Sequence, residues 1–150
     1  YMYHFAYGSN TNINELKKYC SRKNITIIGT GYLDNYIFRY RLIYGKLRIK
    51  AKANIEPRKG STVYGLIVNI KGSLNKLHKK EGLLDHIYII HKNLKIHSIS
   101  NNKIYNCFSY VMENNVKLEE SKPSRSYCKK ILDAAHSFNF PKPYLKRINC

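Results

Sequence analysis

Apolar and polar positions alternate along much of this 150-residue chain, a pattern that predicts more strands than helices. A buried strand is expected over residues 1–7, and β-rich runs follow over 25–33 and 36–44. In the last run every second residue is tyrosine, phenylalanine or leucine, so one face of that strand should be buried. Further strands are expected over residues 62–70, 86–99 and 103–112.

A second alternating run covers residues 47–55, after a tight turn expected at Gly45. Its apolar residues alternate with polar ones, so the two runs predict a hairpin with one wet, basic face. The polar positions of this face are Lys46, Arg48, Lys50, Lys52 and Asn54. A further turn is expected at Pro57–Gly60.

Helical patterns interrupt the strands in three places. The first runs over Asn12–Arg22, where the leading asparagine can cap the helix and Glu15 would complete a capping box. The others cover residues 73–84 and 123–138, and Pro141 ends the last of them.

Strands with helices inserted between them indicate an α+β fold, built on a mostly antiparallel curved sheet or barrel. The polar stretch 113–123 is expected to be a loop. No internal repeat or linker interrupts the chain, so residues 1–150 are expected to form one domain with a sizeable core.

Charge is the strongest departure in composition, because 27 lysines and arginines against 9 acidic residues give a net charge of +18. Such a charge fits either a polyanionic partner or a solvated, lysine-rich surface. The basic residues are spread along the chain without an established nucleic-acid motif, so we expect no specific nucleic-acid partner. No apolar run is long enough to span a membrane, so we expect no membrane association.

Neither a C-x-x-C pair nor metal-ligand spacing occurs among the four cysteines, Cys20, Cys107, Cys128 and Cys150. They are expected to be reduced thiols in a cytoplasmic protein without a metal site. The even cysteine count and the sequon at residues 24–26 leave a secreted form open. The first residues do not resemble a signal peptide, but the chain starts at Tyr1, so a removed leader also stays open.

A short loop near the start, Phe5-Ala6-Tyr7-Gly8-Ser9-Asn10, is the first candidate functional segment. An apolar strand runs directly into Gly-Ser-Asn, and a helix is expected within two residues. Such a junction points several backbone N–H groups at one place beside the positive end of a helix. The loop therefore predicts an anion-binding pocket.

A carboxylate on an apolar helix stripe is the second candidate. The helix expected over residues 73–84 carries Leu74, Leu77 and Leu84 at helical spacing, and Glu81 falls on the same stripe. Burial raises the pKa of a carboxyl group, which suits general acid–base chemistry near neutral pH.

The residues beside Glu81 bear on this interpretation. Gly82 favours a functional role, because it loosens the helix end and lets a ligand approach closely. The alternative is a glutamate at the edge of the stripe, exposed or paired with a lysine. The adjacent Lys79 and Lys80 are not expected to share its face of the helix.

Four segments of the chain, in order, resemble the γ-glutamylcyclotransferase family over about 140 residues. The first is Phe5–Asn10, and the second covers residues 51–65 with the pattern Ile55-x-Pro57-x-x-Gly60-x-x-Val63-x-Gly65. The third is Leu77-x-x-x-Glu81-Gly82, followed by Tyr88. The fourth is Pro123-Ser124-x-x-Tyr127, followed by Ala134-Ala135 and Pro141-x-x-Tyr144. The chain departs from the family pattern at His78, where an aspartate is frequent, and at Asp133-Ala134 and Phe140-Pro141, where Gly-Ala and Leu-Pro are frequent.

The resemblance implies a small mixed β-barrel with flanking helices and a pocket at one end. It also implies an enzyme of glutathione metabolism that needs no metal or organic cofactor. The α-amine of a γ-glutamyl amino acid or peptide would attack its own γ-carbonyl, which closes 5-oxoproline and expels the second amine. Glu81 is the implied general acid and base. The implied substrate-binding residues are His4, Phe5, Ala6, Tyr7, Gly8, Ser9, Asn10, Tyr88 and Tyr127.

Two alternatives stay open. A cyclotransferase of the same superfamily that acts on γ-glutamyl amines would keep both Glu81 and the loop. A non-catalytic protein on this fold would instead use the basic hairpin face to bind a polyanion. A homodimer is also left open, and the sequence does not identify the leaving amino acid.

Overall fold

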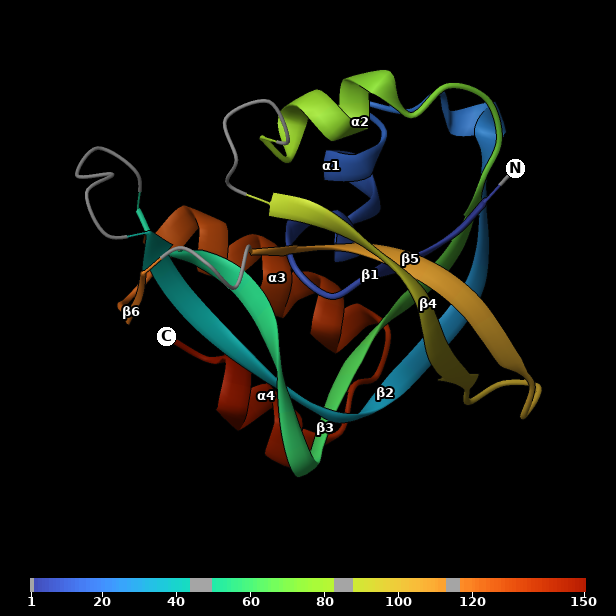
Figure 1. Ribbon diagram of the computed structural model, residues 1–150. Helices are drawn as coiled ribbons and strands as arrows, with labels where there is room; N and C mark the ends of the chain where they lie inside the picture. Colours follow the sequence, from blue (N-terminus) through green and yellow to red (C-terminus); the bar gives the residue numbers. More distant parts are fainter. Residues whose placement is uncertain (1, 44–49, 83–87, 113–116) are drawn as a thin grey trace.

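The computed structural model describes residues 2–43, 50–82, 88–112 and 117–150 (Figure 1). Its strands are β1 (Met2–Ala6), β2 (Ile25–Ile43), β3 (Lys52–Ile70), β4 (Tyr88–Ser98), β5 (Ile104–Met112) and β6 (Leu118–Glu120). Its α-helices are α1 (Ile13–Leu16), α2 (Asn75–Lys80), α3 (Arg125–Ser137) and α4 (Lys142–Ile148). Two 3₁₀ turns, η1 (Ser9–Thr11) and η2 (Arg22–Asn24), flank α1.

The strands form a barrel that is closed by its two longest members. The sheet order is β3-β1-β5-β4-β2-β6, and an additional pairing between β2 and β3 closes the ring. All pairings are antiparallel except the contact between β1 and β5, where His4 lies opposite Phe108. The expected α+β fold with a mostly antiparallel barrel is therefore confirmed.

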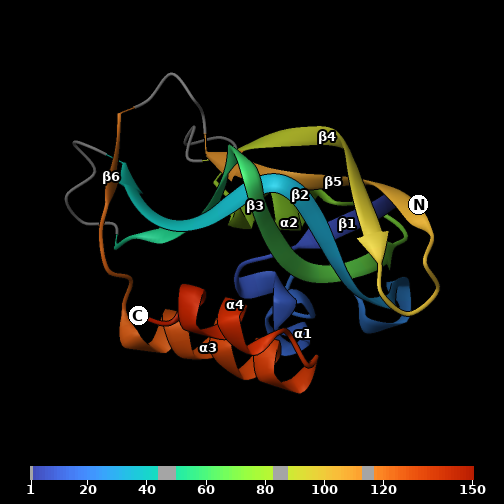
Figure 2. The same cartoon turned by 90° about the horizontal axis from the view of Figure 1, so that it is seen from below.

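The barrel wall separates two hydrophobic cores, because successive side chains of a strand point to opposite faces. In β1 and the residue after it, Phe5 and Tyr7 join the core that α3 and α4 cover. Ala6 joins the other core, which contains Leu16 of α1 and Leu77 of α2. Figure 2 shows α3 and α4 lying together along one side of the barrel. The end of β1 thus lies where both cores meet.

The sequence predicted a break within each of the two long strands, β2 and β3, and these predictions are wrong in part. The runs at 25–33 and 36–44 form one strand, and the turn expected at Pro57–Gly60 lies inside β3. The register shifts between Asp34 and Tyr36, where Asn35 has a positive φ and accepts a hydrogen bond from the Gly60 N–H at 3.1 Å. The turn residues therefore form a bulge that bends the paired strands without ending them. The turn expected at Gly45 lies outside the described residues.

The helix and loop boundaries also differ from the prediction. Asn12 caps α1, but its side chain accepts from the Asn14 N–H, and Glu15 pairs with Lys18 and Lys130 instead of completing a capping box. The expected helix over Asn12–Arg22 therefore shortens to one turn of α-helix. Strand β6 lies in the expected loop at 113–123, and Pro141 starts α4 rather than ending the region. Proline fits the start of a helix, where its missing N–H is not needed.

On the expected basic face of the hairpin, the two arginines that β2 contributes, Arg39 and Arg41, are paired with acidic residues. Arg41 forms two hydrogen bonds to the Glu56 carboxylate, at 2.7 and 2.9 Å, and Arg39 lies 3.3 Å from Glu120. Asn54 is buried rather than wet, because its Oδ1 accepts from the Met112 N–H at 2.9 Å. Lys46 and Arg48 lie outside the described residues.

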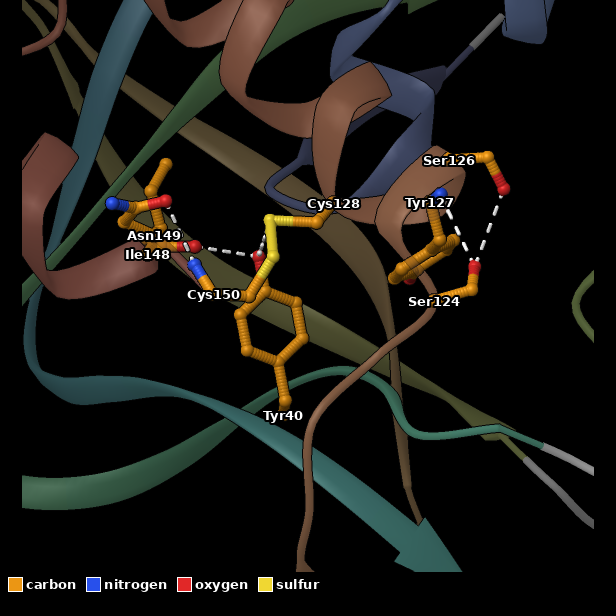
Figure 3. Close-up of a disulfide and its surroundings, with 8 residues drawn as sticks. All are labelled: Tyr40, Ser124, Ser126, Tyr127, Cys128, Ile148, Asn149 and Cys150. Atoms are coloured by element: carbon orange, nitrogen blue, oxygen red, sulfur yellow. Dashed lines mark hydrogen bonds between the residues drawn. A yellow bond between two sulfur atoms is a disulfide. The ribbon is translucent and has the colours of Figure 1, made fainter.

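A disulfide between Cys128 and Cys150 joins the start of α3 to the C-terminal end (Figure 3). The two Cα atoms are 6.5 Å apart, within the usual range for a disulfide. The Tyr40 hydroxyl donates to the Ile148 carbonyl at 2.7 Å, which holds the end of α4 against β2. The expectation of four reduced thiols is therefore wrong for this pair, because α4 returns the chain to α3. Cys20 and Cys107 are free and buried.

We expect Cys150→Ser to lower the free energy of unfolding by about 3 kcal/mol, because a disulfide across 22 positions restricts the unfolded chain. Denaturant unfolding of the oxidised protein measures this loss. Cys128→Ser should cost a similar amount, and the double variant little more than either single one. Thiol titration of the unfolded protein should find two reactive groups, and four would contradict the disulfide.

Candidate active site

A small pocket that is open to solvent lies at the end of β1. All ten residues expected from the sequence to form the site line this one pocket. They are His4, Phe5, Ala6, Tyr7, Gly8, Ser9, Asn10, Glu81, Tyr88 and Tyr127. Three residues that the sequence did not indicate complete its lining, namely Ala53, Ser109 and Tyr110.

The loop after β1 lines this pocket along Tyr7–Asn10. It turns into η1, where the Thr11 N–H donates to the Gly8 carbonyl at 3.0 Å and the Thr11 hydroxyl donates to the Ala6 carbonyl at 3.0 Å. Within the described part of the chain, the N–H groups of Gly8, Ser9 and Asn10 donate to no acceptor. N–H groups without an acceptor are expected at the start of a helical turn, and all three residues line the pocket.

Glycine at position 8 allows a close approach between the loop and β3. A Cβ atom there would lie 3.2 Å from the Cβ of Ala53 and 3.6 Å from the Tyr127 hydroxyl. Any larger side chain would fill the space between the loop and the opposite wall, so this glycine helps to keep the pocket open.

The carboxylate of Glu81 reaches the pocket from the end of α2. The N-cap of this short helix is Leu74 and not Ser73, although Ser73 Oγ accepts from the Asn75 N–H at 3.2 Å, and Leu77 anchors the helix in the core. Glu81 follows one turn after Leu77 and closes the helix, and Gly82 then takes a positive φ of 70°. The side chain of Glu81 is 13% exposed, so it is largely buried as expected, and it is also paired with a lysine, as the alternative predicted. Leu84 of the expected stripe lies outside the described residues.

Two polar side chains hold one oxygen of this carboxylate. The Asn10 amide donates to Glu81 Oε1 at 2.8 Å, and Lys80 Nζ lies 3.1 Å from the same atom. Lys80 Nζ also donates to Ser9 Oγ at 2.9 Å and to Asn10 Oδ1 at 2.8 Å. The expectation that Lys80 would lie apart from Glu81 is wrong, because the helix ends there and the long lysine side chain folds back over the loop.

The opposite wall of the pocket is built from two tyrosines on the backbone of Ala53. Tyr88 donates to the Ala53 carbonyl at 2.6 Å, and the Tyr127 hydroxyl accepts from the Ala53 N–H at 3.1 Å. Burial raises the pKa of both hydroxyl groups well above the ordinary value, and the negative charge of Glu81 adds to this. Both tyrosines are therefore neutral at physiological pH.

The remaining wall comes from β5, which the sequence did not connect with the site. Tyr7 donates a short hydrogen bond to the Tyr110 carbonyl, and the Tyr110 hydroxyl lies 2.8 Å from His78 Nδ1. Ser109 donates to the Phe5 carbonyl at 2.7 Å. The contacts with Phe5 and Tyr7 follow from the parallel pairing of β1 with β5, and no local sequence pattern indicates such a long-range pairing.

His4 lies under the pocket with almost no exposure, at 1%. Its Nδ1 is 3.2 Å from the Phe108 carbonyl. Burial lowers the pKa of His4 to about 4, the hydrogen bond to Phe108 opposes this shift, and the positive charges of Lys80 and His78 add to it. The imidazole is therefore neutral at physiological pH.

The described residues contain no group of three or more histidine, cysteine, aspartate or glutamate side chains that would hold a metal ion. Among the helices of these residues, none is long and apolar enough to cross a membrane.

Comparison with known proteins places the chain in a family. The AIG2-like family model matches residues 62–148, which is more than half of the chain. The chain belongs to the AIG2-like family. No curated protein matches its sequence.

Solved structures support the same fold for this AIG2-like protein. A γ-glutamyl cyclotransferase superposes with a TM-score of 0.85 at 23% identity, over 98% of this chain and 85% of that one. An uncharacterised human protein gives a TM-score of 0.84 at 24% identity, over 98% and 85% of the two chains. A yeast γ-glutamyl cyclotransferase specific to glutathione gives 0.68 at 10% identity, over 98% and 93%. At these identities the likeness establishes a cyclotransferase-type fold.

We expect His4 to make stability fall as the pH is lowered from about 6.5 to about 4. In this window the unfolded chain binds a proton at His4 and the folded chain does not, so the free energy of unfolding rises with pH. The full difference is about 3 kcal/mol, at about 1.4 kcal/mol per pKa unit.

The His4→Gln variant, unfolded by denaturant at several pH values, should lack this component of the pH dependence. His136, exposed on α3, is the matched control, and His136→Gln should preserve the wild-type profile. Identical profiles for His4→Gln and the wild type would contradict the neutral, buried state of His4.

Proposed function

We propose that this protein is a γ-glutamylcyclotransferase, which converts γ-glutamyl amino acids or peptides to 5-oxoproline and a free amino acid. The observation that carries the proposal is the position of Glu81. A largely buried carboxylate faces the same small pocket as three unused backbone N–H groups, and a hydrogen bond from Asn10 joins the two parts. Acid–base and oxyanion-binding groups are thus within reach of one small substrate.

The reaction would need one proton carrier and one anion site. As the neutral α-amino nitrogen of the substrate attacks the γ-carbonyl carbon of the same molecule, Glu81 accepts one of the two protons of that nitrogen. The N–H groups of Gly8, Ser9 and Asn10 then stabilise the negative oxygen of the tetrahedral intermediate. Glu81 returns the proton to the leaving nitrogen as its bond to carbon breaks, so no external reactant is consumed.

The hydrogen bonds of Glu81 suit this role. Both Asn10 and Lys80 reach Oε1, and within the described residues Oε2 has no hydrogen-bond partner. Oε2 is therefore the oxygen that would meet the substrate amine. Because the reacting amine and carbonyl belong to one molecule, the pocket mainly has to hold a folded conformation in which they touch.

The charges around the pocket favour a leaving group that carries a carboxylate. Lys52 is half-buried, and its Nζ lies 4.3 Å from the centre of the Tyr127 ring. Burial lowers its pKa, and the positive charges of Lys80 and Lys130 lower it further. A cation so placed gains from a substrate anion, so γ-glutamyl amino acids suit this site better than γ-glutamyl amines.

The alternative of a non-catalytic polyanion-binding protein has less support. The arginines of the hairpin face are engaged by Glu56 and Glu120, as described above. Such a protein would also have no need for a carboxylate inside a pocket. Binding to a polyanion would weaken steeply with salt concentration, which separates the two functions experimentally.

We expect Glu81→Gln to lose about a hundredfold or more in the rate of 5-oxoproline formation from γ-glutamyl-alanine. The amide keeps the size of the side chain but cannot carry the proton. Chromatographic detection of 5-oxoproline measures the rate. Glu119→Gln, an exposed and chemically identical change, is the control and should keep wild-type activity. Absence of product from several γ-glutamyl substrates with the wild type would refute the function, and equal rates would refute the role of Glu81.

We expect the wild type to prefer γ-glutamyl-glycine over γ-glutamyl-methylamine by about tenfold in kcat/KM, since only the former carries a carboxylate for Lys52. Lys52→Met should remove this preference, and Lys52→Arg should keep most of it. Lys50→Met, two residues away and exposed, is the control. A preference that survives in Lys52→Met would show that another group selects the leaving amine.

A further inference from the structure

The ring of His4 has one nitrogen that is hydrogen-bonded and one that is buried without a partner among the described residues. Nδ1 lies 3.2 Å from the Phe108 carbonyl. A carbonyl oxygen only accepts, so Nδ1 carries the hydrogen and donates it. In the neutral ring Nε2 then has no hydrogen and presents a lone pair, which makes it an acceptor.

This acceptor is buried without a partner. Nε2 forms no hydrogen bond to any described residue, and the His4 side chain lines the pocket beside the loop. A buried polar atom without a partner destabilises a fold, and such atoms are rare in native proteins. The atom therefore marks a place where a bound molecule would supply a hydrogen.

The ring cannot easily turn to satisfy Nε2 elsewhere. It stacks on Phe108 with ring centres 4.8 Å apart, and it meets the edge of Tyr110 at 5.5 Å. Together with the hydrogen bond to Phe108, these contacts fix the direction of the lone pair. A rigid acceptor in a fixed direction is typical of a group that selects its ligand.

We propose that His4 is a substrate-binding residue whose Nε2 accepts a hydrogen bond from an N–H group of the bound γ-glutamyl compound. The inference rests on the proposed cyclotransferase function and adds a requirement to it. A γ-glutamyl amide offers two such donors, the α-amino group and the N–H of the amide bond that is broken. A site built to accept a hydrogen bond discriminates strongly against an analogue that lacks the donor.

Binding of three ligands separates the two donors. γ-Glutamyl-glycine has both of them, γ-glutamyl-sarcosine lacks the amide N–H, and glutaryl-glycine lacks the α-amino group. Calorimetric titration in a Glu81→Gln background prevents turnover. We expect γ-glutamyl-glycine to bind at least tenfold more tightly than the analogue that lacks the donor used by His4, because that analogue leaves Nε2 unpaired.

Two substitutions of His4 test its part in this preference. Asn can keep the donor to the Phe108 carbonyl but offers no acceptor at the position of Nε2, whereas Gln is long enough to place its amide oxygen there. In His4→Asn the affinity for γ-glutamyl-glycine should fall about tenfold. The affinity for the analogue that lacks the donor used by His4 should stay unchanged. His4→Gln should recover much of the preference. A purely structural role would lower thermal stability without changing the ratio of the affinities.

The outcomes separate this inference from the proposed function. If the wild type forms 5-oxoproline but the affinity ratios are the same in the His4 variants, the inference is wrong and the function stands. If no γ-glutamyl compound is converted, yet the ratios depend on His4, the function is wrong and the binding role stands. Should neither variant fold, the protein that keeps His4 still tests the inference, because equal affinity for all three ligands would overturn it. Equal affinities are also the result expected if a bound water already supplies the hydrogen to Nε2.

Discussion

The hydrogen bond between Asn10 and Glu81 is the contact on which the candidate site depends. It joins residues 71 positions apart in the sequence, one in the first loop and the other at the end of α2. Lys80 reinforces it by bridging Ser9, Asn10 and Glu81 with one ammonium group. Without this contact the loop donors and the carboxylate would belong to two separate elements, each free to move away from the pocket.

Much of the fold and of the candidate site was predictable because the signals were local. Alternation placed most strands, and the position of Glu81 four residues after Leu77 placed the carboxylate on the buried face of its helix. The loop from Phe5 to Asn10 was indicated by the change from an apolar strand to Gly-Ser-Asn. The family resemblance then connected these two segments, which no local pattern could do.

The parts that sequence reasoning missed depend on long-range pairing or on side-chain reach. Tyr110 enters the site because β5 lies beside β1, and Cys150 meets Cys128 because α4 turns the chain back. Lys80 was excluded by helix geometry, which does not apply at the last residue of a helix with a flexible side chain. The breaks predicted near residues 35 and 57–60 are bulges, since a bulge and a turn use the same residue types.

The two tyrosines on Ala53 have a consequence for how the molecule meets other chains. The first half of β3 pairs with β2 along one edge, and at Ala53 both backbone polar groups point away from β2 toward Tyr88 and Tyr127. An unpaired strand edge of this kind is a template for the strand of another protein. By occupying the N–H and the carbonyl with side-chain hydroxyls, the walls of the pocket also close that edge to intermolecular strand addition. A change at either tyrosine would therefore leave a backbone polar group of Ala53 without its partner, and it would also change the shape of the pocket.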